Sequence, residues 1–117
     1  MDVQAAKALC RGFAGATESI KWGNDTVFSV GDKMFACAAN DAGVRSISFK
    51  VEDERFLELT DRPGIVPAPY LARARWVRVE DLDTLPPDEA SALLRRSYEL
   101  VFAKLTKKLQ RELGAGE

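Results

Sequence analysis

The residues of this chain that could do chemistry are cations placed beside tryptophans. Lys21 directly precedes Trp22, and the segment RARWVRV surrounds Trp76 with arginines. A cation beside an indole can make cation–π contacts worth roughly 0.5–2 kcal/mol, and aromatic platforms with cationic neighbours hold single-stranded nucleic acid. The pattern is compatible with a nucleic-acid platform, with a pocket for another ligand, or with an ordinary half-buried sheet.

Catalytic chemistry has little support in the composition. The 117 residues contain no histidine, which removes Ser-His-Asp and Cys-His systems and the usual transition-metal sites. No glycine-rich phosphate loop and no acidic calcium loop is found. Lys21, Lys33 and Lys50 lie near aromatic residues that could desolvate them, but no partner base or cofactor cradle accompanies them. We therefore expect a protein that is not an enzyme and has neither a metal nor a cofactor.

The net charge and the apolar pattern limit which partners and which cellular location can be expected. The net charge is −1, which argues against a strongly basic duplex binder. Cations are nevertheless clustered around Trp76, and a second cluster follows near the end of the chain at Lys104, Lys107, Lys108 and Arg111. There is no apolar run of about 18 residues and no basic-then-apolar leader. Cys10 and Cys37 form no CxxC pair and are expected to be reduced, small apolar residues. We expect a cytoplasmic protein that does not enter a membrane.

The elements that must position the cations and tryptophans follow from periodicity. Apolar spacing predicts a helix over residues 2–12, a short helix over 52–59 and one long helix over 88–113. Strands are predicted over 19–22, 26–30, 33–39, 46–51 and 75–79, with turns between them that include 40–43. Pro67 and Pro69 exclude a central strand after residue 64. This order predicts one domain, residues 1–117, with an α+β two-layer fold in which helices cover one face of an antiparallel sheet.

Strand alternation decides what the other face of that sheet carries. Ser46, Ser48 and Lys50 should project from it, as should Trp76 and Arg78. One interpretation is a concave cationic-aromatic surface used for recognition. The other is that Trp22 and Trp76 pack beneath the segment 67–70 and that the basic side chains are merely solvated.

The chain resembles the MmcQ/YjbR family in five segments that occur in order: GATESIKWG (15–23), VFSVGDKMFA (27–36), SISFKVEDE (46–54), PGIVPAPYLARARWVRV (63–79) and LLRRSYELVFAKL (93–105). The resemblance implies a compact α+β fold akin to type III secretion chaperones. It also carries a DNA-binding label, described as a double-wing arrangement. The positions that match the family pattern are Lys21, Trp22, Gly23, Lys33, Phe35, Lys50, Pro67, Pro69, Tyr70, Trp76, Ser97 and Tyr98.

Two functions follow for this monomer or homodimer. The first is a DNA-associated or regulatory protein that uses the cationic-aromatic sheet surface. The second is an adaptor that binds a protein or a small molecule. Under either function the predicted binding residues are Lys21, Trp22, Lys33, Lys50, Tyr70, Arg73, Arg75, Trp76 and Arg78.

Overall fold

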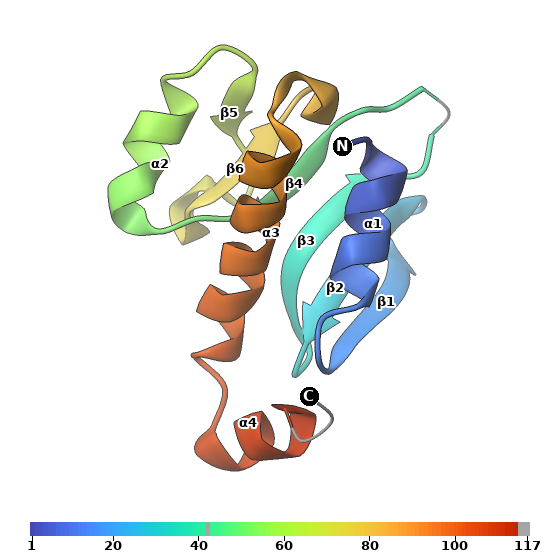
Figure 1. The fold of residues 1–117 in the computed structure, drawn as a ribbon, viewed down its shortest axis with the longest axis vertical. Coiled ribbons are helices and arrows are strands. Elements are labelled where there is room, and N and C mark those ends of the chain that lie inside the picture. The colour runs from blue at the N-terminus through green and yellow to red at the C-terminus, as the bar shows by residue number, and fades with distance from the viewer. Residues whose placement is uncertain (42, 115–117) are drawn as a thin grey trace.

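The structure is a computed structural model that describes residues 1–41 and 43–114. A six-stranded antiparallel sheet has the strand order β1-β2-β3-β4-β6-β5, and helices pack against it (Figure 1). The elements in chain order are α1 (Val3–Arg11), β1 (Ala16–Lys21), β2 (Asp25–Val30), β3 (Lys33–Ala39), β4 (Ile47–Lys50), α2 (Asp53–Thr60), β5 (Ile65–Pro67), η1 (Ala72–Ala74), β6 (Trp76–Val79), η2 (Leu82–Thr84), α3 (Pro87–Phe102) and α4 (Lys107–Gly114).

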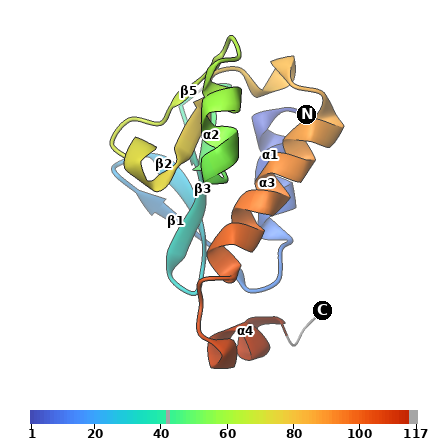
Figure 2. The same ribbon diagram turned by 90° about the vertical axis from the view of Figure 1, so that its left-hand side faces the viewer.

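The helices lie on one side of the sheet, as the apolar patterning predicts. Figure 2 shows α1 and α3 together beside the strands, and α2 packs against β5 and β6. Side chains from all three helices join one buried cluster with the inward residues of the strands, such as Phe28, Phe49 and Val77. The predicted α+β architecture, with an antiparallel sheet covered by helices on one face, is confirmed.

A β-bulge enlarges the core beneath α3. The β2–β3 register shifts between Phe28 and Ser29, so that Phe35 and Ala36 are both buried. The Phe35 ring then meets that of Tyr98 edge-on at 5.4 Å. Ser97 restores the hydrogen bonding that the irregularity interrupts. Its hydroxyl donates to Phe35 O (2.6 Å) and accepts from the Lys50 N–H (2.9 Å), which ties β3 to β4 through α3.

The prediction of one continuous helix to Leu113 is wrong, because α3 ends at Phe102. Thr106 begins a new helix by accepting a hydrogen bond from Leu109 N–H. Gln110 donates to Phe102 O and Leu105 O at the end of α3. The chain turns there because Leu105 is buried against Gly31, where a Cβ would lie 2.7 Å from the leucine Cδ2.

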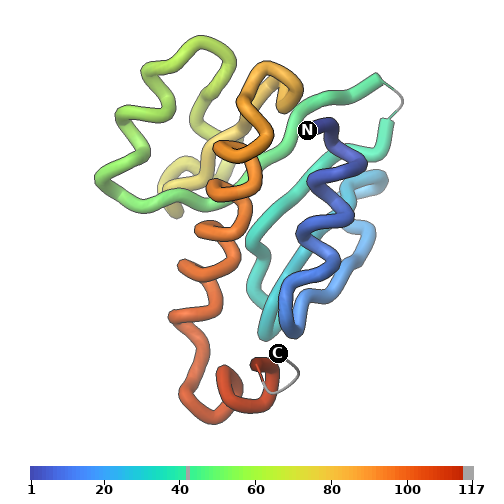
Figure 3. The backbone as a smooth tube through the Cα atoms, viewed as in Figure 1, coloured from blue at the N-terminus to red at the C-terminus, as the bar shows by residue number. Residues whose placement is uncertain are grey.

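The turn directs α4 back beneath the β2–β3 hairpin (Figure 3). The four clustered cations that the predicted helix over 88–113 would have carried together are therefore divided, with Lys104 in the connection and Lys107, Lys108 and Arg111 in α4.

Other predicted boundaries agree with the observed elements to within three residues. Pro67 ends β5 at the edge of the sheet, as the exclusion from central strands requires. The turn predicted at 40–43 includes Ala42, which is outside the described residues. Within 1–41 and 43–114, none of the helices has the length and apolar character needed to cross a bilayer.

Candidate ligand-binding groove

The face of the sheet opposite the helices carries a row of side chains that crosses five strands. Val27 pairs with Cys37, Cys37 with Ser48, and Ser48 with Arg78, which in turn pairs with Val66 of β5. Residues paired in an antiparallel sheet project from the same face. The row therefore places a thiol, a hydroxyl and a guanidinium side by side outside the main core.

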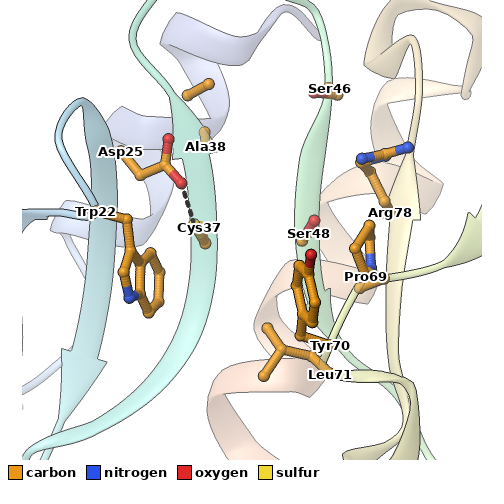
Figure 4. Close-up of a pocket in the computed structure, with 12 residues that line it drawn as sticks. Trp22, Asp25, Cys37, Ala38, Ser46, Ser48, Pro69, Tyr70, Leu71 and Arg78 are labelled. Atoms are coloured by element: carbon orange, nitrogen blue, oxygen red, sulfur yellow. Dashed lines mark hydrogen bonds between the residues drawn. The ribbon is translucent and has the colours of Figure 1, made fainter.

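A groove of about 530 Å³ lies over the middle of this row, a size typical of small-molecule sites. Figure 4 shows β2 and β3 on one side of it, and β4, β6 and the segment after β5 on the other. Its lining residues are Trp22, Asp25, Cys37, Ala38, Ala39, Ser46, Ser48, Ala68, Pro69, Tyr70, Leu71 and Arg78.

Two aromatic side chains stand on opposite walls of the groove. Trp22 follows β1, and Tyr70 follows β5, with Cys37 between them and Ser48 next to the Tyr70 ring in Figure 4. The Trp22 side chain is 64% exposed and that of Tyr70 is fully exposed. Neither ring is held in place by burial, so the backbone must present them.

The backbone presents both aromatics from strained positions. Trp22 has φ 51° and Tyr70 has φ 66°, in the left-handed region that costs an ordinary residue roughly 1–2 kcal/mol. Tyr70 is the third residue of a turn that Leu71 N–H closes on Ala68 O (3.1 Å). A type II turn requires positive φ at that position and favours glycine or asparagine there, after proline. Pro69 is in place, but a large aromatic stands where glycine would fit.

The segment from Ala68 to Arg75 returns to the start of β6 and forms backbone hydrogen bonds with Trp76. Ala68 N–H donates to Trp76 O (3.0 Å), and Trp76 N–H donates to Leu71 O (3.3 Å). Trp76 is only 4% exposed. The predicted display of Trp76 as a recognition surface is wrong, although its side chain does share a face with Arg78. Trp76 is buried, as the alternative interpretation expects, whereas Trp22 is exposed and does not fit it.

Lys50 and Arg75, which were predicted to contact a ligand, have structural partners instead. The Lys50 ammonium donates to Ala74 O (2.5 Å). Burial lowers the Lys50 pKa, the positive charges of Lys104 and Arg75 lower it further, and Asp53 opposes them. Arg75 pairs with Asp53 (3.2 Å), and its guanidinium lies 5.4 Å from the Phe56 ring centre. Neither side chain lines the groove.

Three further cations predicted as binding residues lie outside the groove lining. Lys21 ends β1 beside Trp22, and Arg73 belongs to the turn of η1 after Tyr70; both are exposed. Lys33 begins β3 at the β2–β3 turn, at the other end of β2 from Trp22. Of the nine predicted residues, the groove brings together Trp22, Tyr70 and Arg78.

The comparison with family models matches the YjbR model over residues 11–100. This chain belongs to the YjbR family. A crystal structure of the Deinococcus radiodurans protein DR2400, which has a DUF419 domain, is similar at 30% identity and a TM-score of 0.87, over 97% of this chain and 88% of that one. A Pseudomonas syringae protein shares the fold at 24% identity and a TM-score of 0.70, over 86% and 99% of the two chains. No curated protein matches in sequence.

The groove of this YjbR family member also contains residues that the sequence analysis did not select. Asp25 and Cys37 line the β2–β3 wall of the groove, where the Cys37 thiol donates to the Asp25 carboxylate at 3.8 Å. Burial and the adjacent Asp25 raise the pKa of the Cys37 thiol to about 11. Pairing of β2 with β3 brings these two residues together, and only strand register could have revealed it.

Proposed function

We propose that this YjbR family member is a non-enzymatic binding protein that holds a planar ligand between Trp22 and Tyr70. The observation that carries the proposal is the pair of exposed aromatics on opposite walls, each at a left-handed backbone position. Strain of this kind clusters at ligand clamps, where the surrounding structure maintains it. An exposed ring in such a conformation gains nothing for the fold, which supports a role in binding.

The chemistry of the groove suits a flat ring. Stacking on one aromatic side chain contributes roughly 1–3 kcal/mol to the binding of a base, and two walls can contact both faces of the ring. Ala38, Ala39 and Leu71 supply apolar lining between the polar groups. This mixture of apolar walls and few polar groups is common in small-molecule sites.

The absence of catalysis is part of the proposal. The raised pKa of the Cys37 thiol in the groove keeps it protonated near neutral pH. Its neighbour Asp25 favours that protonated form by accepting its hydrogen bond. The Ser46 and Ser48 hydroxyls, also in the lining, have no activating base bonded to them among the described residues. A protonated thiol beside a carboxylate supports binding rather than covalent chemistry.

The two tryptophans make the proposal directly testable by NMR. Trp22 is 64% exposed and Trp76 is 4% exposed, so a ¹⁵N-labelled sample should give two separate indole signals, assigned with Trp22→Phe. We expect phenol and indole to shift the Trp22 signal and to leave the Trp76 signal in place. The saturated and equally uncharged counterpart of phenol, cyclohexanol, should bind roughly tenfold more weakly. Equal shifts from flat and saturated rings would contradict a stacking groove.

We propose DNA binding as a second candidate function, in the form of a single strand drawn across the same groove. The supporting observation is that Lys21 and Arg73, exposed beside the two clamp aromatics, have no ion pair within residues 1–41 and 43–114. Phosphates flanking a stacked base could contact both. Binding of a fluorescent oligothymidine should weaken steeply with salt, and Lys21→Ala should reduce the slope by about one. Lys33→Ala is the matched control, and a salt-independent response would remove this candidate.

A further inference from the structure

Arg78 differs from the other half-buried arginines in the described part of the chain. Arg55, Arg62 and Arg75 each have a carboxylate within 4.0 Å. Arg78 is also half-buried, on β6 between β4 and the edge strand β5, yet no ion pair or side-chain hydrogen bond joins it to any residue of 1–41 or 43–114. A partly desolvated cation without a counter-charge is unfavourable, and a bound anion would offset that cost.

Two hydroxyls lie beside the guanidinium with their donors available. Ser48 is directly opposite Arg78 in the β4–β6 register, and Ser46 precedes it on the same face. Both are half-buried in the groove lining, and neither hydroxyl has a partner among the described residues. A guanidinium and two hydroxyls form a donor-rich site suited to the oxygens of a carboxylate or a phosphate.

The β2–β3 wall of the groove, opposite Arg78, carries a negative charge instead of a positive one. Asp25 lies on the β2–β3 side, across from Arg78 (Figure 4), and the Cys37 thiol is its one side-chain contact in the described structure. Its negative charge repels an anion from that wall. The electrostatics therefore orient a charged ligand, with its acidic end toward Arg78 and its ring between the aromatics.

We infer that the ligand of the groove is a planar ring bearing a carboxylate or phosphate, and that Arg78, Ser46 and Ser48 bind this acidic group. The inference rests on the proposed function, because the ring is the part held by Trp22 and Tyr70. Aromatic carboxylates and nucleoside monophosphates share this chemistry. Arg78 supplies the specificity for charge, since its planar fork can donate two parallel hydrogen bonds to either group.

The test compares probes that differ only in the acidic group. Adenosine 5′-monophosphate is paired with adenosine, and indole-3-acetate with indole-3-acetamide, each titrated while the Trp22 indole signal is followed. A charge-assisted contact to Arg78 should make at least one acid roughly 10- to 100-fold tighter than its neutral partner. The pair that shows the larger ratio identifies phosphate or carboxylate as the natural group.

Substitutions then test whether Arg78 causes the tighter binding of the acid relative to its neutral partner. Arg78→Met should reduce the acid-to-neutral ratio to about one, and Arg78→Lys should retain part of it. Arg111→Met in α4 removes an equal charge far from the groove and should leave the ratio unchanged. An amide spectrum that changes only for residues near the substitution shows that each variant is folded.

The possible failures are distinguishable. Neutral rings that bind as tightly as their acids would overturn the anion subsite and leave the aromatic clamp intact. An acid advantage that persists in Arg78→Met would also overturn the subsite. If no ring, charged or neutral, moves the Trp22 signal, the clamp itself is wrong.

Discussion

Replacing Tyr70 with glycine should stabilise the protein while it weakens binding. The Tyr70 side chain is fully exposed, so its removal sacrifices almost no packing. Its φ of 66° suits glycine, and at positive φ glycine is favoured over alanine by about 1 kcal/mol. With an unfolding entropy of about 2.1 cal/mol/K per residue, a chain of 117 residues converts that gain into a rise of about 4 °C in Tm. Loss of one stacking wall should weaken the binding of planar probes roughly 5- to 100-fold.

The assay is thermal unfolding of Tyr70→Gly and Tyr70→Ala, followed by circular dichroism. The alanine variant keeps the strained backbone and should resemble the unmodified protein within about 0.5 kcal/mol. Leu57 provides a control of opposite sign, because it is exposed in the interior of α2. There glycine should be less stable than alanine by about 1 kcal/mol. A Tyr70→Gly variant no more stable than Tyr70→Ala would refute the claim that Tyr70 is held under strain.

Three further predictions concern the fold and the groove wall. Ser97→Ala removes the hydrogen bonds of two backbone groups and should reduce the free energy of unfolding by about 2–4 kcal/mol. The control Ser91→Ala, in the same helix, should change it by less than about 0.5 kcal/mol. Similar losses in the two variants would contradict the bridging role of Ser97. The hydrogen bonds from Arg62 lower the Glu89 pKa, so their stabilisation is complete above the ordinary value of 4.5 and is lost as pH falls through the lowered pKa. Glu89→Gln should thus cost about 0.5–1 kcal/mol at pH 7, and urea titrations should show this cost shrinking as pH falls through the lowered pKa; a deficit independent of pH would be evidence against this. Because the Cys37 pKa is raised to about 11, iodoacetamide at pH 7.5 should label it roughly a hundredfold more slowly than a free cysteine, and labelling at the free rate would show that the thiol is not protected.

Strand alternation predicted the polar floor of the groove correctly. The period of two in Ile47–Lys50 and Trp76–Val79 is enough to place Ser48 and Arg78 on the face opposite the core. The facing direction of a side chain is a local property, so it can be read from a short segment. Arg78 and Ser48 lie where that reasoning puts them.

The covering of that face depends on contacts between distant residues and was not predictable in the same way. Trp76 has the alternation of a displayed residue but is buried, and the segment after β5 returns to it and forms backbone hydrogen bonds with it through Ala68 and Leu71. Cations near it were expected to bind, and two of them instead satisfy local partners: Lys50 donates to Ala74 O, and Arg75 pairs with an acidic side chain.

The helix break after Phe102 was hidden for a related reason. Leu105 and Leu109 continue the apolar period of α3, so periodicity alone extends the helix through them. The helix ends early because Leu105 packs closely against the backbone of Gly31, which is distant in the sequence. Helical spacing shows which residues are apolar and cannot show which neighbour buries them.

The most direct test of the aromatic clamp is an intermolecular NOE experiment with a bound planar probe such as indole-3-acetate. The chain has two tryptophans and two tyrosines, so the ring protons of Trp22 and Tyr70 can be assigned with single variants. The clamp predicts NOEs from one probe ring to both of these side chains, and none to Trp76. Contacts to only one of the two aromatics, or to neither, would contradict it.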